Sequence, residues 1–259
     1  MKTIKSFWGI IDHQTIIITI LALAATYICS HYGWQANMPS GLIGVAVIFP
    51  IVFSINAAYR RREEALKYFS SFKGHALALY WAHRDWVPED APDQAQRGRQ
   101  LISDLMAALV PYFRAPRGQA QQEVARIYEL FSALSRSHEL NRKAGLTAGE
   151  VSRANQYLRA MVIDFDRMRN IRLYRTPMSL RAYSRVFLNA FPIFFGPYFA
   201  HLAQQQYAVV GYAVAVLYSL VLVSLDNIQE DLENPYDGIG EDDINLELPP
   251  DYRRALEQA

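Results

Sequence analysis

Two long stretches of the chain contain no charged residue. From Gln14 through Tyr59, and again from Val186 through Leu225, the sequence has no Asp, Glu, Lys or Arg. The helices of a soluble domain need a polar face toward water, so stretches of this length are unusual outside a membrane. Each stretch is long enough for two spans of about 20 residues joined by a turn. The pattern therefore predicts two transmembrane hairpins.

The four predicted spans are joined in pairs by short polar turns. The first hairpin, residues 1–60, contains spans at about 14–33 and 41–59, and the second, residues 186–225, contains spans at about 186–203 and 207–225. Three prolines lie inside these spans, where each removes a backbone hydrogen bond and predicts a kink or a break: Pro50, Pro192 and Pro197.

The residues between the hairpins, 61–185, are polar, charged and periodic in the manner of helices. No stop signal follows Tyr59, so the second span is expected to continue as one long helix to about Trp86. Further helices are predicted near 94–113, 119–141 and 148–174, the last beginning with a capping box of Thr147 and Glu150. An acidic tail occupies residues 226–259. The fold class predicted is all-α: four transmembrane helices plus a helical cytosolic domain.

Lysine and arginine are confined to one side of these spans. The turns at 31–40 and 201–206 contain none, whereas the opposite ends carry Lys2, Lys5, Arg60, Arg61, Arg62, Arg169, Arg172, Arg175, Arg181 and Arg185. Positively charged loops remain in the cytoplasm. The asymmetry predicts a multi-pass protein of the cell (inner) membrane with both termini and the central domain in the cytoplasm.

The average composition of the chain hides this segregation of charge. The net charge and the absence of catalytic motifs argue against two classes of function. The overall content of 51% hydrophobic and 20% charged residues resembles that of a soluble protein. A net charge of +1 argues against a nucleic-acid partner, which selects a basic surplus. The sequence contains no HExxH, CxxC, GxGxxG or GxSxG motif, so we expect neither enzymatic activity nor a cofactor.

The second span carries an apolar stripe. Val45, Phe49 and Phe53 recur at i, i+4 and i+8 and so lie on one face of the helix. Packing against lipid or another span explains such a stripe. The functional alternative is a pore narrowed by apolar rings, which can gate by losing its water.

Two charged runs have a similar pair of interpretations. The arginines that follow the second span are either the inner rim of such a pore, attracting anions, or an ordinary cytoplasmic flank: Arg60, Arg61 and Arg62. The carboxylates near the C-terminus suit calcium, which prefers oxygen ligands, but lack the EF-hand spacing and also fit a solvated tail: Glu241, Asp242 and Asp243.

Three stretches, within this order of spans, resemble the bestrophin family. Residues 41–65, GLIGVAVIFPIVFSINAAYRRREEA, resemble the family's pore-lining second helix. Residues 175–178, RTPM, resemble the Thr-Pro that precedes its third span. Residues 226–246, DNIQEDLENPYDGIGEDDINL, resemble the acidic segment with Asn-Pro-aromatic of its bacterial members, and this stretch is the most specific.

The resemblance implies a homopentameric ion channel around a central pore. It places the neck at Val45, Phe49 and Phe53 and a second constriction, the cytosolic aperture, at Val151. Val151 also falls in the first turn of a predicted helix, where amides and the helix dipole favour an anion. Residues 236–240 separate the Asn-Pro-aromatic segment from the acids, as in calcium-independent bacterial relatives.

The expected function is passive conduction of small anions such as chloride. A monovalent cation (sodium) channel of the same fold is the alternative within the class, because an apolar neck does not select the sign of the ion. A non-conducting membrane scaffold or sensor is the alternative from another class. The expected partners are other copies of the chain, the lipid bilayer and the permeant ion.

Overall fold

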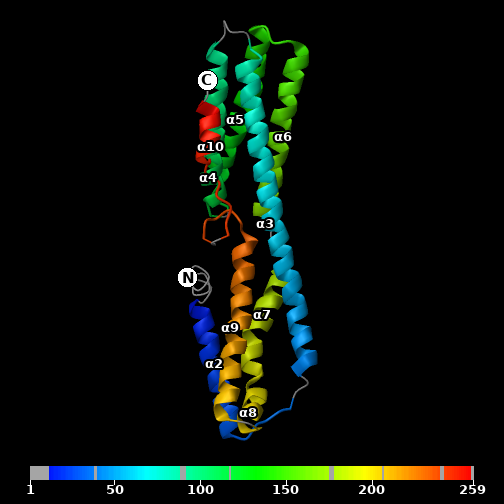
Figure 1. The fold of residues 1–259 in the computed structure, drawn as a ribbon, viewed down its shortest axis with the longest axis vertical. Helices are drawn as coiled ribbons and strands as arrows, with labels where there is room; N and C mark the ends of the chain where they lie inside the picture. Colours follow the sequence, from blue (N-terminus) through cyan, green and yellow to red (C-terminus); the bar gives the residue numbers. More distant parts are fainter. Residues whose placement is uncertain are drawn as a thin grey trace. The chain divides into compact units, whose positions relative to one another are not determined.

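The structure is a computed structural model that describes residues 12–37, 40–87, 92–116, 118–174, 178–205, 207–239 and 242–257. At positions 40, 42–50, 92, 178–181 and 184 it describes the backbone alone. In these ranges every regular element is a helix, as Figure 1 shows. The helices are α2 (His13–His31), α3 (Ser40–Asp85), α4 (Pro92–Arg114), α5 (Gln121–Lys143), α6 (Ala148–Leu173), α7 (Met178–Phe194), α8 (Gly196–Gln205), α9 (Ala208–Glu233) and α10 (Pro250–Glu257).

The chain divides into two compact units. The first unit comprises residues 1–60 and 175–233, and the second comprises residues 61–174 and 234–259. The division falls between Arg60 and Arg61, inside α3, so this 46-residue helix contributes to both units. Its length agrees with the prediction of one uninterrupted helix from the second span onward.

The first unit is a bundle of apolar helices. α2 contacts α7, α8 and α9, and α9 also contacts α7 and α8. One apolar cluster joins α3, α7 and α9 through Ile51, Leu188 and Leu222. At the start of α2 the Asp12 carboxylate accepts the backbone N–H of Thr15 at 2.8 Å, which satisfies one of the free amides of the first turn.

Three helical segments of the described chain are long and apolar enough to cross a membrane. They are His13–His31, Arg185–Gln205 and Ala208–Glu233, and they contain most or all of the first, third and fourth predicted spans. The predicted second span, 41–59, lies on the helical backbone of α3. The side chains of residues 42–50 fall outside the described residues, so its membrane insertion stays a prediction.

The second hairpin contains a break of the kind that its prolines predict, and it differs from the prediction in the bounds of its helices. At Phe195 the third span breaks between α7 and α8, two residues before Pro197, whose ring clashes with the carbonyl four positions back but suits the first turn of a new helix. The helices also extend beyond the apolar runs, since α7 begins at Met178 and α9 continues to Glu233. Residues 226–233, expected in the tail, are therefore helical.

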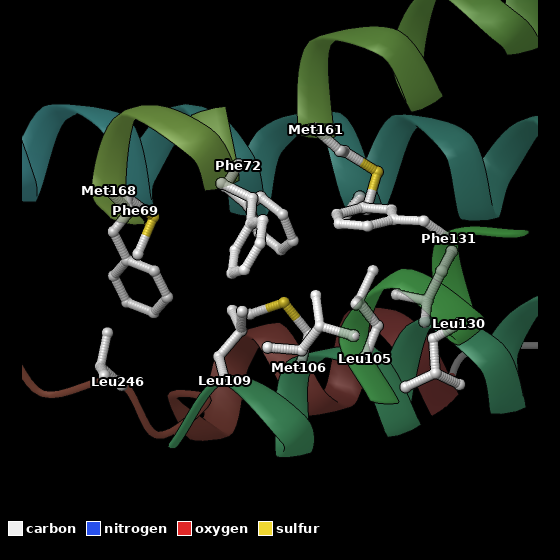
Figure 2. Close-up of a cluster of buried hydrophobic side chains, with 14 of the residues drawn as sticks. Phe69, Phe72, Leu105, Met106, Leu109, Leu130, Phe131, Met161, Met168 and Leu246 are labelled. Atoms are coloured by element: carbon white, nitrogen blue, oxygen red, sulfur yellow. The ribbon is translucent and has the colours of Figure 1, made fainter. Parts of the chain in front are cut away.

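The second unit is built around one apolar core, part of which Figure 2 shows. α3 contributes Phe69 and Phe72, which face residues of α4, α5 and α6. These partners are Leu105, Met106 and Leu109 of α4, Leu130 and Phe131 of α5, and Met161 and Met168 of α6. Burial of such side chains stabilises a domain by about 1.5–3 kcal/mol each.

The C-terminal segment, residues 234–257, belongs to this core. Tyr236, Leu246 and Leu256 are each at most 3% exposed and pack into the same cluster. The Tyr252 hydroxyl donates a hydrogen bond of 2.9 Å to the Lys73 carbonyl of α3. The segment that the sequence suggested as a solvated acidic tail thus contains apolar side chains that pack into the core of the second unit.

A glycine sets the distance between α8 and α9. A Cβ added at Gly211 would lie 2.4 Å from the carbonyl oxygen of Phe199 and 2.6 Å from the Ala203 Cβ. Real Cβ atoms do not approach backbone this closely, so only glycine permits the contact. Small residues of this kind let membrane helices pack backbone against backbone.

We expect Gly211→Ala to lower the free energy of unfolding by about 1–3 kcal/mol, because α9 must move away from α8 to admit the methyl group. The measurement is the thermal midpoint of the purified protein in detergent micelles. Gly74→Ala is the matched control, since a Cβ there meets nothing within 4 Å and alanine favours helix. Equal midpoints for the two variants would contradict the close approach.

Candidate functional site

The stripe predicted as a pore neck lies on α3 in the first unit. The helix is continuous through positions 45, 49 and 53, so these positions share one face. The side chains of Val45 and Phe49 lie outside the described residues. Phe53 is 60% exposed, whereas Ile51 is 2% exposed and packs against α7 and α9. α3 therefore has a packed face that carries Ile51 and, about 200° around the helix, an exposed face that carries Phe53.

The predicted aperture residue Val151 lies in the first turn of α6, in the second unit. Its side chain is half-buried, and its N–H donates to the Thr147 carbonyl at 3.0 Å. The predicted capping box is present: the Glu150 carboxylate accepts the Thr147 N–H at 3.1 Å, and Thr147 Oγ1 accepts the Glu150 N–H at 3.4 Å.

This capping box changes the electrostatics expected beside Val151. Two amides of the helix N-terminus are occupied by side chains of the chain itself. The Glu150 carboxylate also places a negative charge next to Val151 in the sequence. Both effects reduce the attraction that an uncapped helix N-terminus would offer to an anion.

The three arginines predicted as a pore rim have different surroundings. Arg60, the last residue of the first unit, is exposed. Arg61 donates a hydrogen bond from Nη2 to the Ile171 carbonyl, near the C-terminal end of α6. Arg62 donates from Nε to the Asp242 carbonyl at 2.9 Å. Two of the three side chains thus hold parts of the second unit together.

The carboxylates weighed as calcium ligands are spread over different surroundings. Glu241 lies outside the described residues, and Asp242 is exposed. Asp243 accepts the Gly238 N–H at 2.5 Å, and burial beside Asp237 raises the pKa of its carboxyl to about 6. No group of three metal-binding side chains occurs among the described residues.

A charged cluster that the sequence analysis did not single out lies in the first unit. Arg185 of α7 forms ion pairs with Glu230 and, at 3.7 Å, with the buried Asp226, both on α9. Asn189 donates to the same Asp226 carboxylate at 3.3 Å. The signal was present as Asp226 and Glu230 at i and i+4, and as Arg185 and Asn189 at the same spacing. The cluster ties α7 to α9.

The fold is that of bacterial bestrophin homologues. Two crystal structures of a bacterial Bestrophin homolog from Klebsiella pneumoniae, each carrying a single substitution, match with TM-scores of 0.78 and 0.79 at 16% and 17% identity. The first match covers 95% of this chain and 100% of that chain, and the second covers 94% of each. A third match, at TM-score 0.77 and 16% identity, is described only as a membrane protein.

Neither of the other comparisons finds a relative. No family model matches the chain, and no curated protein does. The resemblance noted in the sequence is confirmed by the likeness of the fold to the bacterial bestrophin homologue structures.

The cap of α6 can be tested by Thr147→Ala. Loss of the hydroxyl removes one partner of the capping box, so the free energy of unfolding should fall by about 1 kcal/mol. Hydrogen exchange of the backbone amides of residues 148–151 should become correspondingly faster. Thr147→Ser, which keeps the hydroxyl, should behave as the unmodified protein. If alanine and serine at this position exchange alike, the cap does not hold the first turn.

Proposed function

We propose that this chain, which has the bestrophin fold, is one subunit of a passive ion channel and assembles as a homopentamer around a central pore. The observation that carries the proposal is the match to bacterial bestrophin homologues over about 95% of the chain. The apolar helices of the first unit support a location in the membrane. The proposed membrane is the cell (inner) membrane, with both termini in the cytoplasm, because Lys and Arg lie on one side of the spans.

The proposed neck is the exposed face of α3 that carries Phe53. An apolar side chain 60% exposed in the single chain, such as Phe53, is available to lie toward a central axis or a neighbouring subunit. Val45 and Phe49 occupy the same face by helical periodicity. Rings of apolar side chains at such a constriction exclude water until the pore widens.

The proposed aperture lies at Val151. A single branched apolar residue repeated by five subunits would form a second narrow ring. Its position is fixed by the capping box at Thr147, which sets where α6 begins. The aperture would then be shaped by the packing of the second unit.

Chloride is the first candidate for the permeant ion. Exposed Arg60 lies about two turns beyond Phe53, the last proposed neck position, and would place a ring of positive charge at the cytoplasmic end of the neck. The first turn of α6 presents its positive dipole end beside Val151. Both features favour small anions.

Sodium, or another monovalent cation, is the second candidate. The Glu150 carboxylate lies next to Val151 in the sequence and would ring the aperture with negative charge. Arg61 and Arg62, which the sequence allows either as an anion-attracting rim or as a cytoplasmic flank, bond to backbone carbonyls of the second unit. With these contacts, the case for a permeant cation is stronger than it is from the sequence alone.

Reversal potentials distinguish the two ions. We expect purified protein in planar bilayers under a tenfold KCl gradient to conduct and, if chloride is carried, to reverse toward the chloride equilibrium potential. Reversal toward the cation potential would replace chloride by a cation. Glu150→Gln is informative in either case, because removal of the carboxylate should shift the reversal potential toward chloride. Glu139→Gln, on the exposed surface of α5, serves as its control.

The oligomer is measured in parallel. The native mass in a nanodisc, corrected for lipid, should be five times the 29.6 kDa subunit mass. Absence of conductance together with a different stoichiometry would favour the non-conducting scaffold or sensor.

The neck can be tested by replacing Val45, Phe49 and Phe53 together by alanine. Smaller rings hold water more readily, so open probability or unitary conductance should rise severalfold. The control replaces exposed apolar residues of α2, Ile16, Ile17 and Ile20, by alanine, which should leave the currents unchanged. Unchanged currents in the α3 variant would assign its stripe to packing.

A further inference from the structure

Two histidines face each other inside the second unit. His83 lies near the end of α3 and His138 near the end of α5, and their ring centroids are 5.4 Å apart with planes at 64°. The two residues are 1% and 2% exposed. Such complete burial is unusual for histidine, whose polar ring normally reaches water or a partner.

Several polar atoms of this cluster have no partner in the described part of the chain. Neither ring nitrogen of His83 has a hydrogen bond of ordinary geometry, and the Gln94 backbone is its polar neighbour; Nε2 of His138 has none. Asn141, one turn beyond His138 and fully buried, has no partner for either amide atom. Only Nδ1 of His138 is bonded, at 2.7 Å to Oδ1 of Asn155 on α6. Because an amide oxygen only accepts, Nδ1 carries the proton in the neutral ring.

The chain makes room for this pair. A Cβ at Gly98 of α4 would lie 2.5 Å from Nδ1 and 2.8 Å from Cγ of the His83 ring. A glycine at this position is therefore required for the imidazole to sit between α3 and α4. The buried pair joins the ends of four helices: α3 and α5 through the rings, α4 through Gly98, and α6 through Asn155.

The surroundings oppose a positive charge on either ring. Burial and the neighbouring His138 lower the pKa of His83 to about 4, and only the Gln94 backbone of α4 acts in the other direction. Burial also lowers the pKa of His138, against a raising effect of Asn155. Among the residues that the structure describes, no carboxylate acts on either ring. The nearest charges along the helices are paired with each other, Arg84 with Asp85 and Glu139 with Arg142.

A metal ion does not fit this cluster. A divalent cation such as zinc takes at least three protein ligands, whereas the described residues supply two imidazoles here and no carboxylate or thiolate that acts on the pair. The described residues also contain no group of three His, Cys, Asp or Glu with suitable geometry. The proton is the cation that such a site can take up. A protonated ring is unfavourable without water or a partner, so protonation destabilises the water-free packing around the pair.

We propose that the buried pair of His83 and His138 is an acid-sensitive latch. At neutral pH the pair keeps the helix ends packed together where α6 begins. When the cytosolic side is acidified, the pair releases them. A protonated ring must reach water, so protonation favours an opened arrangement of the helix ends. The release reaches α6 through Asn155, which lies one turn beyond Val151 on the same helix face. Its effect on ion flow rests on the proposed aperture at Val151.

The size of the effect follows from linkage. An imidazole exposed in the opened arrangement titrates near its ordinary pKa of about 6.5, whereas that of buried His83 is about 4. Between these values the opened arrangement binds more protons, so acid favours it. From pH 7.5 to pH 5 the ratio of opened to closed arrangement should rise by about 30-fold.

Hydrogen exchange of the full-length protein in nanodiscs tests the latch. After correction for intrinsic exchange rates, protection in residues 138–156 should fall by about 30-fold between pH 7.5 and pH 5. Residues 101–109 of α4, in the middle of the same unit, should keep their protection. Unchanged protection in residues 138–156 would overturn the latch without any variant being needed.

Variants assign the effect to the pair. His83→Leu and His138→Leu each remove a titrating ring and leave an apolar side chain in the core, and the double variant should lose the pH dependence. His75→Gln is the matched control, because His75 lies on α3 of the same unit but is half-exposed beside Asp164. The same loss of protection in the double variant as in the unmodified protein would overturn the assignment.

Currents separate the latch from the channel. Stepping the cytosolic side from pH 7.5 to pH 5 should change the conductance of the unmodified protein and of His75→Gln, but not that of the double leucine variant. Exchange that responds to pH while the current does not would overturn the link to Val151. A protein without current at any pH would instead contradict the proposed function, and the exchange experiment would still decide the latch.

Discussion

In the interior of a lipid bilayer a backbone amide or carbonyl finds no water, and every such group must bond within the protein. The helices of the first unit satisfy this constraint locally, and two of their buried hydroxyls do the same. Thr26 Oγ1 and Ser219 Oγ each donate at 2.8 Å to the carbonyl four residues earlier. With the backbone and these two hydroxyls satisfied, the helices associate through close contact, which Gly211 makes possible between α8 and α9.

The second unit is stabilised in a different way, because moving its apolar side chains out of water into a core is favourable. The core collects side chains from α3 to α6 and from the C-terminal segment. Charged residues add hydrogen bonds at the edge of this core. Arg61 donates to a carbonyl near the end of α6, and Arg62 donates to a carbonyl of the C-terminal segment. Polar groups left inside this core, above all His83 and His138, are exceptions to the rule that buried polar atoms are paired, and exceptions of this kind suggest a role.

The sequence predicts the helices well where one periodic pattern dominates. The start of α6 followed from Thr147 and Glu150, and the break at Phe195 from the neighbouring prolines, because both signals act within a single turn. The position of Tyr236 or Leu246 in a distant core did not follow, since such contacts depend on helices far away in the sequence. The partners of Arg61, Arg62 and His83 were hidden for the same reason. The neck at Val45, Phe49 and Phe53 and the aperture at Val151 stay predictions that rest on helical position and resemblance.

The placement of the C-terminal segment has a consequence for biosynthesis. Residues 61–174 leave the ribosome before the second hairpin, but their core is complete only when Tyr236, Leu246 and Leu256 arrive. The second unit must therefore wait, partly open, while residues 178–233 are made. A nascent chain of this design exposes apolar surface for longer than its number of helices implies, so chaperones and translation speed should matter more to its yield than the stability of the finished fold.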